Sequence, residues 1–259
     1  MFRVKKIGAV ALFMGLLVVL VGCGKAEQKT EYQDNNFISA LESGLAARWQ
    51  LTDKDDSEAT KADYTKWINV ELAEVTSFRN KKFKSAKLQE AAIAYISSLN
   101  EQKAALKYFS ADEFIEKWSD AYDKRTKALV TINKLHKLKV AKSEQHNLDE
   151  LLGNGKAVNE KTDKDQQVDA LLKTINFTAQ PKDYAEDTYT TYTTEVTNTT
   201  GFDIKAFTAN IKIKDAAGTT VDTQYISTQN WSQNDKVKFD FMTDQQVASY
   251  EVIKDMVEY

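Results

Sequence analysis

Cysteine, proline and histidine are scarce in this chain, which has one cysteine, one proline and two histidines. A single cysteine cannot form a disulfide within the chain or build a cysteine-rich metal site. His136 and His146 are ten residues apart, which is not the i, i+4 spacing of a helical metal pair. The chain also lacks a Gly-x-Ser-x-Gly elbow and a glycine-rich phosphate loop. We therefore expect no metal, no cofactor and no enzymatic activity.

The N-terminus carries the strongest sequence signal. Arg3, Lys5 and Lys6 precede an uncharged run from Ile7 to Val21, and Gly22 stands directly before Cys23. A basic start, an apolar run too short for a typical membrane span, and a small residue before cysteine predict a signal peptide over residues 1–22. An uncleaved signal anchor and a mitochondrial-type leader are the alternatives.

The sequence around Cys23 resembles the cleavage box of bacterial lipoproteins. In that family the cysteine becomes the mature N-terminus and carries a thioether-linked diacylglycerol, so palmitate or a similar chain is expected on Cys23. The resemblance implies a protein held by lipid on the extracytoplasmic face of the cell membrane, because two or more acyl chains anchor stably. Residues 23–36 are then expected to form a polar tether.

Positive charge is not in excess. Removing residues 1–22 leaves 32 basic and 38 acidic side chains, a net charge of −6. This balance excludes a generally basic protein built to bind nucleic acid. The excess of negative charge lies in the C-terminal part. Residues 36–176 hold 23 basic and 22 acidic side chains, whereas residues 177–259 hold 7 basic and 13 acidic side chains.

Composition changes near residue 177, which predicts an α+β protein of two parts. Residues 37–176 show apolar stripes at helical spacing, such as Phe37, Leu41, Leu45 and Trp49, and predict an antiparallel helical bundle. Ser110 and Glu113 form a capping-box pattern at the start of a long helix, and Gly153-Asn154-Gly155 suggests a turn. Residues 177–186, with the single proline, are the predicted linker.

Residues 187–259 predict a small antiparallel β-sandwich. Apolar residues alternate with polar ones along Phe207–Ile213 and Val237–Phe241, and Asp215–Gly218 and Asn198–Gly201 have the form of tight turns. The order of these segments resembles the FxLYD-type, immunoglobulin-like domain of Gram-positive surface lipoproteins. Ile211–Asp215 keeps the alternation and the aspartate of the eponymous motif but lacks its phenylalanine and tyrosine.

Two clusters of cations stand near predicted helix ends. The first comprises Arg79, Lys81, Lys82, Lys84 and Lys87, and the second comprises Lys134, Lys137, Lys139 and Lys142. One interpretation is that they complement the negative C-terminal ends of helices. The other is that they contact anionic lipid headgroups or wall polymers beside the anchor.

Three further residues are candidates for special roles. Glu71 and Arg125 each interrupt an apolar stripe, and a charge facing a core must be paired or reach solvent, so we predict an ion pair between their helices. The alternative is that each only borders its stripe. Trp231 lies in the polar segment Gln229–Asp235 and is the first candidate for an exposed recognition anchor, although aromatic residues more often pack in a core.

The sequence therefore favours a monomeric, non-enzymatic surface protein that binds an envelope component or a protein partner, or acts as a scaffold. The alternative is a cell-envelope hydrolase that uses bundle carboxylates as acid and base, for which the candidates are Glu113, Glu116, Asp120 and Asp123. A solute receptor is a third possibility, but such receptors alternate strands and helices along the chain, whereas this one separates them.

Overall fold

The computed structural model describes residues 31–53, 59–182, 184 and 186–259. Cys23, the signal peptide and most of the tether lie outside these ranges. The described residues form five α-helices followed by two three-stranded antiparallel sheets, which confirms the predicted α+β class. None of the described helices is both long and apolar enough to cross a membrane.

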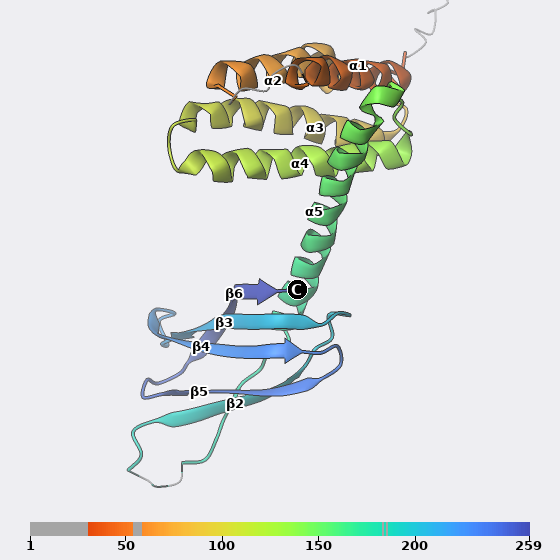
Figure 1. Cartoon of the computed structure of the whole chain (residues 1–259). Coiled ribbons are helices and arrows are strands. Elements are labelled where there is room, and N and C mark those ends of the chain that lie inside the picture. Colours follow the sequence, from red (N-terminus) through yellow and green to blue (C-terminus); the bar gives the residue numbers. More distant parts are fainter. Residues whose placement is uncertain (1–30, 54–58, 183, 185) are drawn as a thin grey trace, which may run out of the picture.

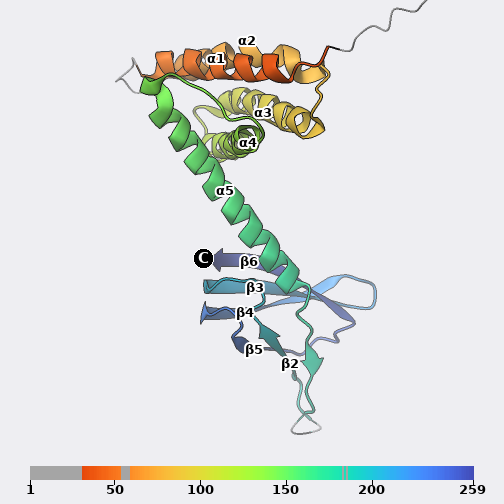
Figure 2. The ribbon, with the colours of Figure 1, turned by 90° about the vertical axis from the view of Figure 1, so that its right-hand side faces the viewer.

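The helical part contains two antiparallel hairpins. Helices α1 (Asp34–Thr52) and α2 (Lys61–Val75) form one, and α3 (Ala86–Ala105) and α4 (Glu113–Leu135) form the other. Short 3-10 turns follow α2, α3 and α4, at Thr76–Asn80, Leu106–Tyr108 and Lys142–Glu144. Figure 1 shows the α1–α2 hairpin stacked on the α3–α4 hairpin, and in Figure 2 α1 and α2 run across the page while α4 is seen nearly end-on, so the two hairpins cross at an angle.

Capping interactions mark the starts of some helices, but two helices do not begin as the sequence predicted. The α1 helix begins at Asp34, inside the predicted tether. Ser110 does not cap α4, because the chain enters that helix from a tight turn in which the Ala111 N–H donates to the Tyr108 carbonyl at 2.7 Å. The capping box is at α2 instead, where Thr60 and Asp63 exchange hydrogen bonds.

Helix α5 (Gln145–Leu172) joins the two parts, and the predicted turn at Gly153-Asn154-Gly155 is wrong. These residues are helical, and a Cβ on Gly155 would overlap the Thr126 carbonyl oxygen of α4. Gly155 therefore permits a close crossing of two helices rather than a change of direction. Figure 2 shows α5 running obliquely from the hairpins to the sheets.

The sandwich is built from six strands in two sheets. One sheet has the order β1-β2-β5, from β1 (Thr178–Ala179), β2 (Thr190–Thr197) and β5 (Lys236–Thr243). The other has the order β4-β3-β6, from β3 (Ile204–Lys214), β4 (Thr220–Trp231) and β6 (Ser249–Glu258). The short strand β1 lies within the predicted linker. The Gly218 N–H donates to the Asp215 carbonyl at 3.0 Å, as the predicted turn between β3 and β4 requires.

Two hydrophobic cores hold the molecule together, and α5 contributes to both. Leu148, Leu151 and Leu152 at its start are buried with the residues of the hairpins. Val168, Leu171 and Leu172 at its end are buried with residues of both sheets. Between Gly155 and Val168 no residue of α5 is buried.

Candidate functional site

The predicted ion pair between Glu71 and Arg125 is present and fully buried. Three hydrogen bonds join the two side chains, from Nε of Arg125 at 3.1 Å and from its Nη2 at 2.8 and 3.0 Å. Glu71 is 0% exposed and Arg125 is 1% exposed. Their helices, α2 and α4, belong to different hairpins, so this pair fastens one hairpin to the other.

Two further groups, neither of them predicted, share the same carboxylate. Arg48 of α1 donates to Oε2 of Glu71 at 2.9 Å, and the Tyr95 hydroxyl of α3 donates to Oε1. All four hairpin helices therefore meet at Glu71. The cluster holds one negative and two positive charges inside the protein, a net charge of +1.

In this cluster, burial and the neighbouring charges act on each group in different directions. Burial alone would raise the pKa of the Glu71 carboxyl, but Arg125, Arg48 and Tyr95 outweigh it and hold that pKa below its usual value. Burial, together with repulsion from Arg125, lowers the pKa of Arg48. The pKa of the Tyr95 hydroxyl is raised, first by burial and then by Glu71. Because the carboxylate is bonded by groups from three other helices, the arrangement is suited to fastening helices.

A small hollow of about 210 Å³ adjoins the cluster, lined in part by Arg48, Arg125, Tyr122 and the start of α5. Asp53 and Glu150 also line it and bring negative charge to its mouth. The hollow therefore does not present an uncompensated positive surface to an anion.

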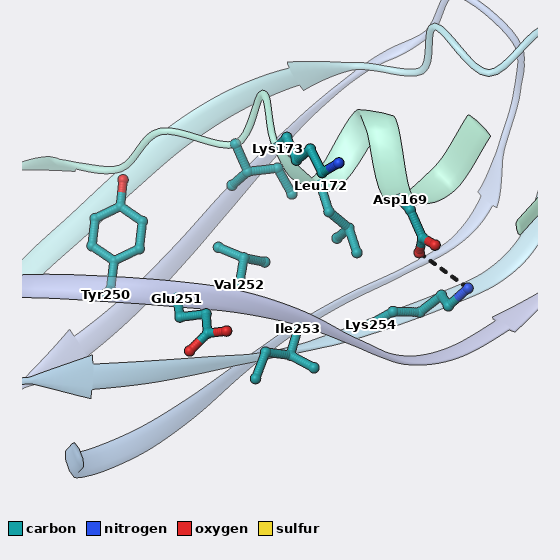
Figure 3. A pocket seen from close by; sticks show the side chains of 9 residues that line it. Asp169, Leu172, Lys173, Tyr250, Glu251, Val252, Ile253 and Lys254 are labelled. Atoms are coloured by element: carbon teal, nitrogen blue, oxygen red, sulfur yellow. Dashed lines mark ion pairs between the residues drawn. The ribbon is translucent and has the colours of Figure 1, made fainter. Parts of the chain in front are cut away.

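A larger hollow of about 700 Å³ lies where α5 meets β6. Figure 3 shows Lys254 of β6 pointing toward Asp169 of α5, at 3.2 Å between Nζ and Oδ1. Lys254 also contacts Asp165 at 2.8 Å, and the Tyr259 hydroxyl donates to the same carboxylate. Burial alone would lower the pKa of the Lys254 ammonium group, but the hydrogen bonds and negative charges of Asp165 and Asp169 outweigh it and raise that pKa.

Tyr250, which also lines this hollow, is engaged with protein as well. The Tyr250 hydroxyl donates to Oδ1 of Asn176 at 2.9 Å and accepts from the Phe177 N–H at 2.7 Å. The side chains of Lys254 and Tyr250 thus join β6 to α5 and to the segment that follows it. We interpret this region as the joint that fixes the sandwich to α5.

Trp231 is not an exposed anchor, and that prediction is wrong. It is 1% exposed at the end of β4, packs against Phe207 and Phe239, and donates from its indole nitrogen to the Asp235 carbonyl at 2.9 Å. The physical reason is Asn230, whose φ of 51° breaks the alternation of β4 and turns the next side chain inward. Among exposed aromatic residues of the sandwich, Tyr225 is 70% and Tyr189 is 54% exposed.

The two predicted basic clusters are only partly brought together. Four cations at the start of α3 and two at the end of α4 lie at the end of the hairpins where α1 begins: Lys81, Lys82, Lys84, Lys87, Lys134 and Lys137. Arg79 instead donates to Ser97, well along α3, at 3.2 Å. The Lys139 N–H donates to Glu42 at 2.6 Å, and Lys142 belongs to the turn before α5.

The candidate carboxylates of the alternative hydrolase are exposed on α4. Burial, followed by the charge of Asp120, raises the pKa of the Asp123 carboxyl. His136 lies beside Asp34 at the end of α4, whereas His146 is exposed at the start of α5. Within the described ranges, no group of three or more His, Cys, Asp or Glu side chains is placed to hold a metal ion.

Comparison with known proteins gives no match: no protein-family model, no curated protein and no solved structure resembles the chain significantly. The function must therefore be argued from the chain's own residues.

Proposed function

We propose that this chain is a lipid-anchored protein of the extracytoplasmic face of a bacterial membrane. In this proposal the helical part lies near the anchor, and the sandwich binds an envelope component or a protein partner. The lipoprotein-like box that ends in Cys23 supports the anchor.

The observation that carries the proposal is the double role of α5. Its 28 residues correspond to a length of about 42 Å. One end is buried in the helical core and the other in the sandwich core, so the helix is held at both ends. Such an arrangement carries the sandwich away from the hairpins at a set distance, which suits a module that must reach a partner beyond the membrane surface.

The anchor is tested by metabolic labelling with palmitate. We expect the native protein to incorporate the label and the Cys23→Ala variant to accumulate as an unlabelled precursor. Labelling of Cys23→Ala to the native extent would overturn the lipid-anchor part of the proposal.

The binding role is tested by site-specific photo-crosslinking in living cells. A photoreactive residue at Tyr225 reports on the sandwich, and one at Ile115, which is 69% exposed on α4, is the matched control on the helical part. We expect discrete adducts from position 225 and few from position 115. Adducts confined to position 115 would contradict the assignment of binding to the sandwich, as would the absence of adducts from position 225.

A further inference from the structure

A patch of six exposed lysines marks the end of the hairpins where α1 begins. We call this the basic end, and define it by Lys81, Lys82, Lys84, Lys87, Lys134 and Lys137. Two hollows bring the start of α3 and the end of α4 together: one is lined by both Lys87 and Lys134, and the other by Lys84 and His136, with Asp34 of α1.

The chain enters the helical part at the basic end. The Gln33 N–H donates to the Lys82 carbonyl at 2.9 Å, and the Asp34 carboxylate accepts from the backbone N–H groups of Lys84 and Ser85 at 2.7 and 3.0 Å. About ten residues separate Gln33 from Cys23, and a chain of that length spans at most ~35 Å. A lipid on Cys23 would therefore keep the basic end close to the bilayer.

Helix electrostatics explain only part of this accumulation of charge. Lys134 stands in the last turn of α4, where a cation is favourable. Lys84 and Lys87, however, flank the start of α3, where the helix dipole already presents positive charge and no acidic residue stands in the first turn. Within the described ranges, none of the six lysines forms an ion pair with a carboxylate.

We propose that the basic end contacts the anionic headgroups of the lipid bilayer that holds the anchor. Cations near such a surface are attracted to the negative surface potential, and the attraction weakens beyond a Debye length of about 10 Å at 0.1 M salt. The contact would orient the anchored protein, with the basic end toward the membrane. This inference rests on the proposed lipid anchor, but its test does not use the anchor.

The experiment uses a soluble form of residues 24–259, which retains both hydrophobic cores, and vesicles of phosphatidylcholine with or without phosphatidylglycerol. We expect sedimentation with the anionic vesicles only, and loss of that binding when salt is raised several-fold. The variant Lys82→Gln/Lys84→Gln/Lys87→Gln/Lys137→Gln should bind roughly 600-fold more weakly, because each lysine near the surface contributes about fivefold.

A matched variant removes four exposed lysines elsewhere: Lys107→Gln/Lys117→Gln/Lys156→Gln/Lys173→Gln. It has the same net charge, and we expect its binding to fall less than about threefold. Circular dichroism establishes that both variants keep their helices, and a variant that loses them is replaced by its Lys→Arg counterpart, which should bind as the native protein does.

Three results would overturn the proposal. The first is equal binding to neutral and anionic vesicles, or binding to neither. The second is an equal loss in the two lysine variants, which would indicate a general charge effect. The third is salt-sensitive binding to inorganic polyphosphate without binding to anionic vesicles, which would assign the patch to an anionic polymer. Because the soluble form lacks Cys23, failure here leaves the palmitate result unaffected, and the two proposals fail separately.

Discussion

Neutralising Glu71 is the sharpest test of how the hairpins are held together. The Glu71→Gln substitution keeps the shape of the side chain but leaves Arg48 and Arg125 buried without a counter-charge. The net charge of the cluster rises from +1 to +2. Two unit charges about 4 Å apart attract by about 4 kcal/mol at an effective dielectric constant of about 20, and Glu71 takes part in two such pairs.

Part of that attraction offsets the cost of burying the groups, so the expected loss is smaller than the sum of the pairs. Breaking a buried ion pair by removing one partner typically costs about 3–5 kcal/mol. Set against a total stability of about 5–15 kcal/mol for a domain, this is a large fraction. With a urea dependence of about 2 kcal/mol per molar, the unfolding midpoint of the helical part should fall by about 2 M.

The assay is urea unfolding monitored by far-ultraviolet circular dichroism. The helical signal at these wavelengths reports on the hairpins and α5, which contain the α-helices of the described residues. The matched control is Glu101→Gln, which removes an exposed ion pair with Lys124 between α3 and α4. An exposed pair of this kind contributes no more than about 1 kcal/mol. If Glu71→Gln were no more destabilising than Glu101→Gln, the reasoning on the buried cluster would be refuted.

The same cluster predicts a pH dependence. The pKa of Glu71 is lower in the folded protein than in the unfolded chain, so the unfolded chain binds more protons between the two values. The stability from Glu71 is therefore fully present above the unfolded pKa of about 4.3 and decreases as the pH falls below it. The native protein should lose stability below this pH more steeply than Glu71→Gln, measured by urea midpoints at several pH values.

Four further substitutions have expected effects on stability, and the signs of these effects differ. Gly155→Ala should destabilise the helical part by about 1–3 kcal/mol, because the added Cβ meets the Thr126 carbonyl. Gly153→Ala has open space around it and should stabilise the helical part by about 0.5–1 kcal/mol. If urea unfolding showed that both substitutions change the stability in the same direction, this reasoning would be contradicted. Trp231→Ala should cost about 3–5 kcal/mol in thermal unfolding of the sandwich, and a change below about 1 kcal/mol would argue against its burial. Gln102→Leu should leave stability unchanged or raise it by about 1–3 kcal/mol, since neither amide atom has a partner in the core; a loss above 1 kcal/mol in urea unfolding would reveal a missed hydrogen bond.

The sequence contained enough information to predict the Glu71–Arg125 pair, because a charge on an apolar stripe must find a partner. Arg48 was missed although the same argument applies to it, since it follows Leu41 and Leu45 at helical spacing on α1. Tyr95 was not predicted to take part either. Its hydroxyl, once buried, also requires a partner, and that requirement could have placed it at the cluster.

The errors arise where a local pattern has two meanings. Gly153-Asn154-Gly155 is a turn signal by composition, but a glycine inside a helix also permits close crossing of a neighbour, and only the packing decides between them. The polar residues around Trp231 suggest a loop by composition. The positive φ of Asn230, which the sequence alone does not reveal, turns the indole into the core.

The part of α5 that lies between the two hydrophobic cores depends for its stability on both the helical part and the sandwich. Residues 156–167 include no buried side chain, and their contacts with the rest of the protein are made by exposed or partly exposed side chains, such as Asp165 with Lys254 of β6. An isolated helix of such length is marginal in water. Pairs such as Glu160 with Lys164, four residues apart, add only a few tenths of a kcal/mol each. The buried leucines at its two ends must therefore provide most of the stability, so loosening either core should fray α5 from that end and release the sandwich from its set distance.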